Sequence, residues 1–361
     1  MEKLNENILA DPEYDGRDIA LTHFSVKLLK EAGVWGRIPN ISKSPIKEAR
    51  VLNGYSPYFL HFDHRKAGCD ELGYLISNHL IRKAYYDEIK NFSNIELITD
   101  TTVTSINRNP EAATITLSNG KIIETRLIIA ADSRFSETRR GEGISARTLD
   151  FGQICVVCRM QHEEPHFDIA YECFYYGRTL AVLPLTENQS SIVITAPSNQ
   201  HNKILNIAEN KFNKEVSAQF KFRLGNMKLI SKRFAYPLIA VYANRFVSTR
   251  FALIGDAAVG MHPVTAHGFN LGLKGQNALA KEIKNALEKK IDIGYPSVLT
   301  NYQSIHRRVS YPLYLATNGI VCLYTNETSK ARFLRKIILK LANNIWPVKR
   351  VILNKLTAIE D

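Results

Sequence analysis

The sequence lacks any apolar run near the length of about 20 residues that a bilayer-spanning helix needs. Residues 1–7 are polar and partly acidic, unlike the start of a signal or transit peptide. Cysteine is also scarce: there are five in 361 residues, which excludes a disulfide scaffold and favours a reducing compartment. We therefore expect a cytoplasmic protein, with a chain long enough for two domains.

Metal-binding patterns are equally sparse. Cys155 and Cys158 form a single CxxC, which lies in an apolar run typical of a buried strand, and the sequence has no second CxxC. Another polar group falls within one turn and consists of His162, Glu163, Glu164 and His166. We favour core cysteines and a polar hairpin tip over a metal or redox site, and we predict no metal.

The formal net charge is +12. The basic residues are scattered and no nucleic-acid-binding motif occurs, so we predict no nucleic-acid partner. Residues 330–355 differ, because they hold many basic residues and no acidic one, with apolar residues at helical spacing. Two interpretations of this basic amphipathic helix stay open. It docks on the core with a solvated face, or it contacts an anionic membrane surface.

The most informative stretch is residues 251–273. An apolar run at 251–254 predicts a buried strand, and Gly255 and Asp256 end it. A loop with glycine and proline follows, and residues 270–287 have the periodicity of a helix. A helix start offers free N–H groups and a partial positive charge to a polar or anionic ligand. The alternative is a strand-to-helix connection that binds nothing.

The remaining patterns predict a mixed α/β chain. Helices are expected at residues 19–32 (with Thr22 as N-cap and Gly33 as stop), 73–92 and 202–220. Strands are expected at 49–63 (with a turn), 95–98, 102–106, 113–117, 122–124 and 126–131, the last re-entering a parallel sheet. Asn119-Gly120 predicts a hairpin. Strands at 153–160, 170–176, 179–184, 191–195 and 227–238 predict a mostly antiparallel sheet.

The stretch Gly255-Asp256-Ala-Ala, followed by Pro263 and by Gly268-Phe269-Asn270, resembles the second FAD-binding signature of the class A flavin monooxygenases. It is most similar to that of the ubiquinone-biosynthesis hydroxylases. The resemblance implies that Asp256 holds the ribityl chain of FAD. It also implies that the segment from Pro263 to Asn270 lies along the isoalloxazine. The family usually has His at position 259 and Gly-Gln-Gly at 266–268, and the variant found here marks a subgroup.

Two further segments resemble this family. Residues 15–22 resemble the segment after its second strand, which implies an FAD contact for Arg17; a surface arginine near a helix cap is the alternative. Residues 131–139 resemble its middle signature, which implies that Asp132 and Arg139 help place FAD and the nicotinamide donor; a helix cap at Asp132 is the alternative. Ser133 stands where the family has Gly. His262 and His267 flank the flavin loop and are weaker candidates for flavin or substrate contact.

The resemblance implies an α/β fold: a Rossmann-like FAD-binding domain, an inserted, mostly antiparallel β-sheet substrate domain and C-terminal helices. The family's opening G-x-G-x-x-G unit has no match here, so we expect the FAD-binding domain to be N-terminally incomplete, through a misplaced start codon or a truncated gene. We assign 1–40, 69–150 and 243–300 to FAD binding, 41–68 and 151–242 to the substrate domain, and 301–361 to a basic helical region.

The implied activity is hydroxylation of the aromatic ring of a polyprenylated phenol in ubiquinone biosynthesis. By resemblance, NADH or NADPH reduces FAD, and a C4a-hydroperoxyflavin formed with O2 transfers the oxygen. We assign no catalytic side chain. Two alternatives stay open: a flavin hydroxylase of another aromatic substrate, and a truncated non-catalytic remnant or scaffold. Further expectations are a ubiquinone-biosynthesis complex and peripheral contact with the inner face of the membrane through the basic helix.

Overall fold

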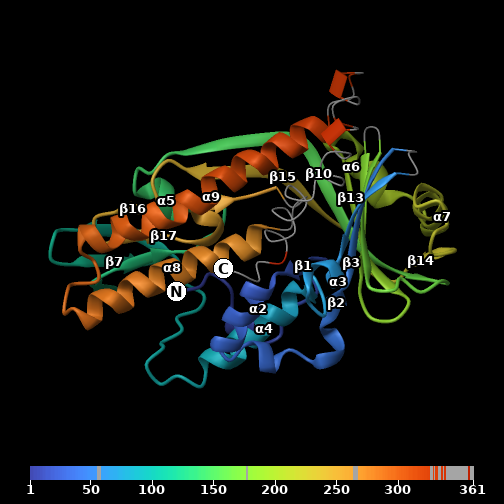
Figure 1. The fold of residues 1–361 in the computed structure, drawn as a ribbon. Helices are drawn as coiled ribbons and strands as arrows, with labels where there is room; N and C mark the ends of the chain where they lie inside the picture. The colour runs from blue at the N-terminus through green and yellow to red at the C-terminus, as the bar shows by residue number, and fades with distance from the viewer. Residues whose placement is uncertain are drawn as a thin grey trace. The chain divides into compact units, whose positions relative to one another are not determined.

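The computed structural model describes residues 1–54, 58–175, 178–262 and 267–325, together with 328, 330, 331, 335, 337, 338 and 357. The chain divides into two compact units (Figure 1). The first consists of Met1–Asp11, Ile89–Phe151 and Ile239–Gly319. The second consists of Pro12–Glu88, Gly152–Leu238 and Ile320–Asp361. Three elements run from one unit into the other: β10 (Ala146–His162), β15 (Phe234–Ala243) and α9 (Pro296–Thr325).

The first unit contains an antiparallel sheet of β6 (Val103–Arg108), β7 (Ala113–Leu117) and β8 (Ile122–Thr125). Gly120 has a φ of 83° in the turn between the last two strands, so the predicted hairpin is confirmed. The strand predicted at 95–98 is wrong. Ile95 and Leu97 are exposed, and of the apolar residues only Ile98 packs on the core, so this segment stays irregular. The short helices of the unit are α1 (Glu6–Ala10) and α5 (Glu137–Gly141).

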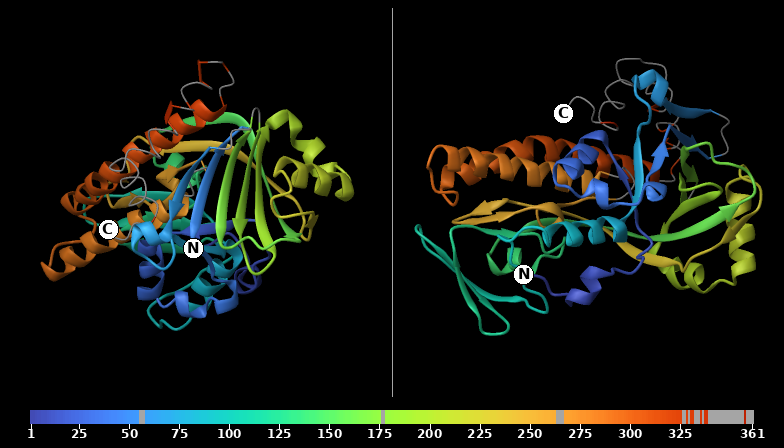
Figure 2. Two further views of the ribbon diagram at one scale, coloured as in Figure 1. Left: turned by 45° about the vertical axis from the view of Figure 1, so that its right-hand side comes forward. Right: turned by 90° about the horizontal axis from the view of Figure 1, so that it is seen from below.

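A second sheet of this unit contains the parallel pair that the sequence predicted: β9 (Ile128–Ala130) pairs in parallel with β17 (Phe251–Leu253). The strand β16 (Val247–Ser248) adds to it antiparallel. All three residues of β17 are buried, as the apolar run predicted. Helices α8 (Gly268–Glu288) and α9 lie side by side (Figures 1 and 2), and the Tyr302 hydroxyl of α9 donates to the Leu253 carbonyl at 2.6 Å.

The second unit is built on a large sheet. In spatial order this sheet contains β18 (Val259–Gly260), β15, β10, β13 (Gln189–Pro197), β12 (Arg178–Pro184), β11 (Ile169–Tyr175), β3 (Glu48–Asn53) and β4 (Phe59–Asp63). From β10 to β4 the pairs are antiparallel except β11 with β3, which confirms the mostly antiparallel sheet. β14 (Met227–Leu229) pairs with the far end of β10. Helices α6 (His201–Asn206) and α7 (Glu209–Gln219) cover one face (Figure 2), where Phe212 and Val216 share a buried apolar cluster with Val156.

A small sheet in the same unit corrects two predicted helices. β1 (Asp18–Leu21) and β2 (Ser44–Ile46) both pair with β5 (Gly73–Ser77). The helices begin only afterwards, as α2 (His23–Glu31) and α4 (Asn78–Ile89). Leu75 and Ile76 are fully buried in β5, so tertiary packing outweighs their helical spacing. The N-cap prediction is confirmed, because the Thr22 side chain accepts from the Ser25 N–H.

Other short elements complete the chain. They are α3 (His64–Ala67), β18 (Val259–Gly260) and the 3-10 turns Trp35–Arg37, Asn40–Ser42, Ser198–Gln200 and Gly255–Ala257. The helix predicted at 202–220 is interrupted after α6, where Ile207 is extended with a ψ of 138°. Most of the basic segment 330–355 lies outside the described residues. Within the described part of the chain, we find no helix with both the length and the apolar character needed to cross a membrane.

Candidate cofactor site

The turn after β17 is shaped by glycine. Gly255 has a φ of 57°, in the left-handed region that side chains with a Cβ disfavour. In α8, a Cβ added at Gly272 would lie 3.5 Å from the Gly255 Cα, so the start of this helix packs closely on the turn. The strand, the turn and the helix start are therefore held together as the sequence predicted.

Asp256 follows in this turn with a side chain that is 35% exposed. Its Oδ2 accepts from the Arg134 guanidinium at 3.0 Å, and the same guanidinium donates to the Ile239 carbonyl at 3.0 Å. Its Oδ1 makes no hydrogen bond to any described residue. An accessible, oriented carboxylate oxygen of this kind can accept a hydrogen bond from a ligand hydroxyl.

The turn after β9 lies against this one. Ser133 has a φ of 77°, so it adopts the left-handed conformation that the family's glycine adopts without strain. Asp132 is exposed, and its carboxylate accepts from the Ser136 hydroxyl and, at 2.9 Å, from the Thr138 N–H. Burial alone would raise the pKa of Asp132, but these hydrogen bonds hold it below the usual value. Ser136 is the N-cap of α5, and Asp132 supports this cap through its bonds to the Ser136 hydroxyl and the Thr138 N–H.

Arg139 joins the two turns. It is buried, and its Nη1 donates to the Arg134 carbonyl at 3.1 Å and to the Ala257 carbonyl at 2.9 Å. Burial lowers its pKa from a very high starting value, so it stays charged. This geometry makes Arg139 a positioning residue for the turn that carries Asp256. Arg134, which contacts Asp256 directly, was not among the predicted residues, although it stands two positions after Asp132.

The remaining candidates of this unit lie at the start of α8. Gly268, Phe269 and Asn270 form its first turn, the end at which a helix directs its backbone N–H groups outward. His267 directly precedes this turn, and Pro263 lies outside the described residues. A helix of 21 residues places a partial positive charge at this end.

His262 is buried at 3% exposure and packs edge-on against Phe151, with 4.8 Å between the ring centroids. Burial, assisted by the nearby Arg134 charge, lowers the pKa of His262 to about 4. The imidazole is therefore neutral at physiological pH, which suits a wall of an apolar ligand site better than an anion contact.

Arg17 belongs to the second unit, where Asp15 orients it. The Arg17 Nη2 and the Asp15 Oδ2 are 2.5 Å apart, and the Arg17 side chain remains 49% exposed. Asp15 is fixed in turn by the Asn78 amide at 2.7 Å. The guanidinium also lies 5.6 Å from the ring centroid of Tyr236, whose hydroxyl donates to the Asp15 carbonyl. Arg17 is thus preorganised and accessible, as an anion-binding arginine must be.

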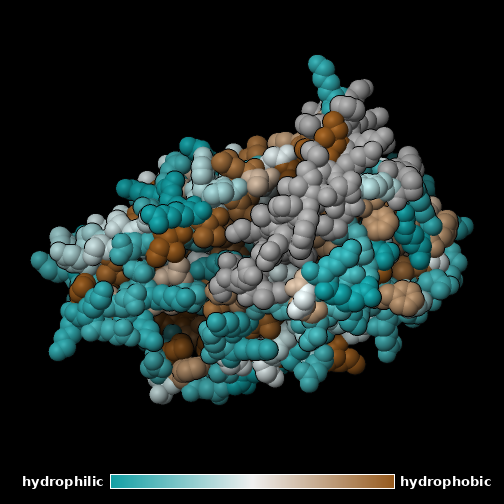
Figure 3. Space-filling view, viewed as in Figure 1, coloured by the Kyte–Doolittle hydropathy of each residue, from teal (hydrophilic) through white to brown (hydrophobic). Residues whose placement is uncertain are grey.

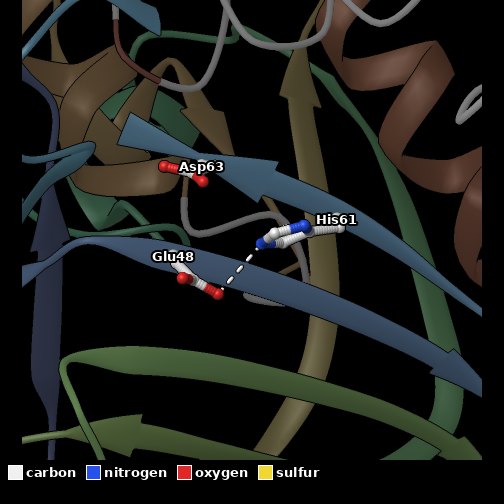
Figure 4. A group of neighbouring side chains, drawn as sticks. All are labelled: Glu48, His61 and Asp63. Atoms are coloured by element: carbon white, nitrogen blue, oxygen red, sulfur yellow. Dashed lines mark hydrogen bonds and ion pairs between the residues drawn. The ribbon is translucent and has the colours of Figure 1, made fainter. Parts of the chain in front are cut away.

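Groups with metal-ligand chemistry have other partners here. Glu48 of β3 and His61 and Asp63 of β4 place ligand atoms within 4.8 Å of one another (Figure 4). However, Arg50 contacts Glu48 at 2.7 Å and Arg65 contacts Asp63 at 2.8 Å. The hydrogen bonds from Arg65 lower the pKa of Asp63 to about 2. Arginine already neutralises these carboxylates, so we interpret the cluster as an ion-pair network.

The polar group at residues 162–166 and the CxxC of β10 also have structural roles. His162 contacts the Glu164 carbonyl through Nδ1 at 2.7 Å and the Ser190 hydroxyl through Nε2 at 3.0 Å. Cys155 and Cys158 are buried and form no disulfide. They lie three positions apart in β10, so their side chains point to opposite faces of the sheet. The prediction of core cysteines is confirmed.

The FAD binding domain family matches residues 8–312 of the chain. Ubiquinone hydroxylase UbiM of Neisseria meningitidis is 46% identical over 361 residues, which cover 99% of this chain and 78% of the relative. Ubiquinone hydroxylase UbiL of Rhodospirillum rubrum is 33% identical over 94% of this chain and 80% of its own. The solved structure of p-nitrophenol 4-monooxygenase PnpA from Pseudomonas putida has a TM-score of 0.74 at 15% identity, over 96% of this chain and 89% of that one. This likeness confirms the α/β fold with a mostly antiparallel sheet and C-terminal helices.

Proposed function

The chain belongs to the FAD-binding-domain family, and we propose that it hydroxylates the aromatic ring of a polyprenylated phenol in ubiquinone biosynthesis. It is an FAD-dependent monooxygenase that uses NADH or NADPH and O2. The turn around Asp256 carries this proposal, because it combines an accessible carboxylate oxygen, a left-handed glycine and the start of α8. The names of the relatives support the substrate class.

The residues present fit FAD. When bound, FAD supplies the oxygen chemistry that side chains cannot provide. Asp256 would accept hydrogen bonds from the ribityl hydroxyls through Oδ1 while Arg134 fixes Oδ2. The N–H groups of Gly268, Phe269 and Asn270 would hold the carbonyl edge of the ring system. Arg17 would contact the negatively charged part of the cofactor, and Arg139 would keep the Asp256 turn in place.

Peripheral contact with the inner face of the membrane is part of the proposal, since a polyprenyl tail partitions into lipid. Ile305, Val309 and Leu315 of α9 are 43%, 41% and 50% exposed, and Figure 3 shows apolar surface along this helix. The net charge of +12 favours anionic lipid. A complex with other enzymes of ubiquinone biosynthesis would serve the same purpose of delivering an insoluble substrate.

The test is the visible absorption spectrum of the purified chain with FAD, followed by NAD(P)H oxidation with a short-tailed 2-prenylphenol and mass analysis of the product. We expect a bound flavin, phenol-dependent oxidation and a gain of one oxygen. Asp256→Ala should weaken FAD binding about 10- to 100-fold, because a charged hydrogen bond is lost. Asp70→Ala, which changes an exposed aspartate of the other unit, should leave FAD binding unaltered.

Two results would redirect the assignment. A preparation that stays colourless with excess FAD would reject the enzymatic proposal and favour the non-catalytic scaffold. A flavin-containing preparation with no product from any prenylphenol would favour a hydroxylase of another aromatic substrate.

A further inference from the structure

We infer that Glu172 is the residue that receives the hydroxyl group of the aromatic substrate, first as a hydrogen-bond acceptor and then as the acceptor of its proton. The inference rests on the proposed function, because it concerns the ring that is hydroxylated. It is carried by the position of Glu172 on β11, by the residues around it and by its lack of a partner.

Glu172 lies on the side of the large sheet opposite to α6 and α7. Its neighbour Cys173 belongs to the core that α6 and α7 cover, and adjacent strand residues point to opposite faces. Across the sheet, Glu172 is flanked by Val51 of β3 and Ala181 of β12, and the same row continues through Val193 and Val157. One carboxyl group therefore stands in a row of otherwise apolar side chains.

No described residue forms a hydrogen bond or an ion pair with this carboxyl. Arg50 is next to Val51 in β3, but it contacts Glu48 and the Tyr171 hydroxyl on the opposite face. A half-buried carboxyl group among apolar side chains, without a partner in the described part of the chain, keeps its hydrogen-bonding capacity for a ligand. A ligand that offers a hydroxyl group would use this capacity.

The titratable groups beside Glu172 are thiols. Burial raises the pKa of Cys155 and of Cys173 to about 12, so both are neutral at physiological pH. The cations Arg223 and Lys221 act on Cys173, on the covered face. The Glu172 side chain is half-buried, and desolvation among its apolar neighbours raises its pKa to about 8. Near neutral pH the group is therefore able both to hold and to release a proton.

The same face leads to the predicted cofactor arginine. Cys155, which interacts electrostatically with Glu172, also interacts with the Tyr236 hydroxyl. The ring of Tyr236 lies under the Arg17 guanidinium. Glu172 and Arg17 are thus linked through the neighbouring side chains of Cys155 and Tyr236 in the second unit. Arg17 offers charge for the cofactor there, and Glu172 stands among apolar side chains suited to an aromatic ring.

The proposed step is a proton transfer without change of oxidation state. The phenol O–H bond breaks, an O–H bond forms on the Glu172 carboxylate, and the electron pair remains on the phenolate oxygen. A phenolate is more electron-rich than a phenol, so its ring reacts more readily with an electrophilic oxygen donor. The acceptor is the carboxylate form, so binding should strengthen as the pH rises through the Glu172 pKa.

The experiment is calorimetric titration with 2-prenylphenol between pH 6.5 and 9, on the wild-type chain, Glu172→Gln and the control Glu209→Gln. Glu209 is an exposed glutamate of the same unit. We expect wild-type affinity to rise about five- to tenfold across this range, because a charge-assisted hydrogen bond replaces a neutral one. Glu209→Gln should behave like the wild type, and Glu172→Gln should bind at every pH with the low-pH affinity.

A readout that needs no variant is the heat of binding in two buffers with different ionisation enthalpies. Wild-type protein should release protons on binding phenol at pH 7, and this release should vanish at pH 9. A Glu172→Gln profile identical to wild type, absence of proton release, or absence of phenol binding would each overturn the inference. Flavin absorbance of the same samples tests the proposed function separately, because phenol binding governed by Glu172 in a chain that holds no FAD would support this inference and reject the enzyme.

Discussion

The most informative stability test is Asp18→Asn, because Asp18 anchors the segment that presents Arg17. The Asp18 side chain is fully buried; its Oδ1 accepts from the Arg159 Nη2 at 2.6 Å and from the Ser77 hydroxyl at 2.8 Å. The guanidinium of Arg159 also lies 4.3 Å from the ring centroid of Tyr14. Asparagine keeps the shape but removes the charge, and it leaves the Arg159 charge enclosed without compensation.

Removing one member of a buried ion pair costs about 3 kcal/mol or more. With a slope of about 2–3 kcal/mol per molar urea, the unfolding midpoint should fall by about 1 M. The matched control is Glu96→Gln, which breaks the exposed Lys121–Glu96 pair and should change stability by less than about 1 kcal/mol. Adding Arg159→Met to Asp18→Asn should recover part of the loss, because the unpaired charge is removed. Equal midpoints for Asp18→Asn and Glu96→Gln would refute the reasoning.

Three other perturbations test the packing. Gly73→Ala should destabilise by about 3 kcal/mol in urea unfolding, since its Cβ would lie 2.3 Å from the Leu21 carbonyl oxygen; an unchanged midpoint would contradict the β1–β5 pairing. Ser133→Gly should alter stability by less than about 1 kcal/mol, whereas Ser133→Val should cost about 2 kcal/mol in its left-handed position; equal effects would exclude that conformation. Burial lowers the pKa of His306 to about 4. The unfolded chain therefore binds a proton first, and stability should fall by up to about 3 kcal/mol between pH 6.5 and 4, a loss that His306→Phe should reduce.

The sequence predicted the turn around Asp256 well because its determinants are local. The strand β17, Gly255, Asp256 and the start of α8 follow one another directly, so composition and spacing describe them fully. The hydrogen bond from Arg134 to Asp256 joins residues 122 positions apart, and no local pattern records such a contact. The sequence does show Glu172 as a carboxylate within an apolar strand. Its importance, however, depends on its neighbours in β3 and β12, which the sequence pattern does not identify.

The errors in secondary structure have a common cause. β1 and β5 have four and five residues and run directly into helices, so their apolar residues merge with the helical pattern that follows. The pairing of Leu21 with Tyr74 decides their conformation, and this pairing joins segments far apart in the chain. The division into Met1–Asp11, Ile89–Phe151 and Ile239–Gly319 against the rest likewise reflects tertiary contacts.

The parallel pairing of β3 with β11 has a consequence for how the chain is made. Residues 48–53 cannot form this pairing until residues 169–174 leave the ribosome, because their partner strand is synthesised more than a hundred residues later. Such pairing raises contact order and slows folding. Until then β3 can pair only with β4, and an incompletely paired sheet edge of this kind makes the nascent chain prone to aggregation.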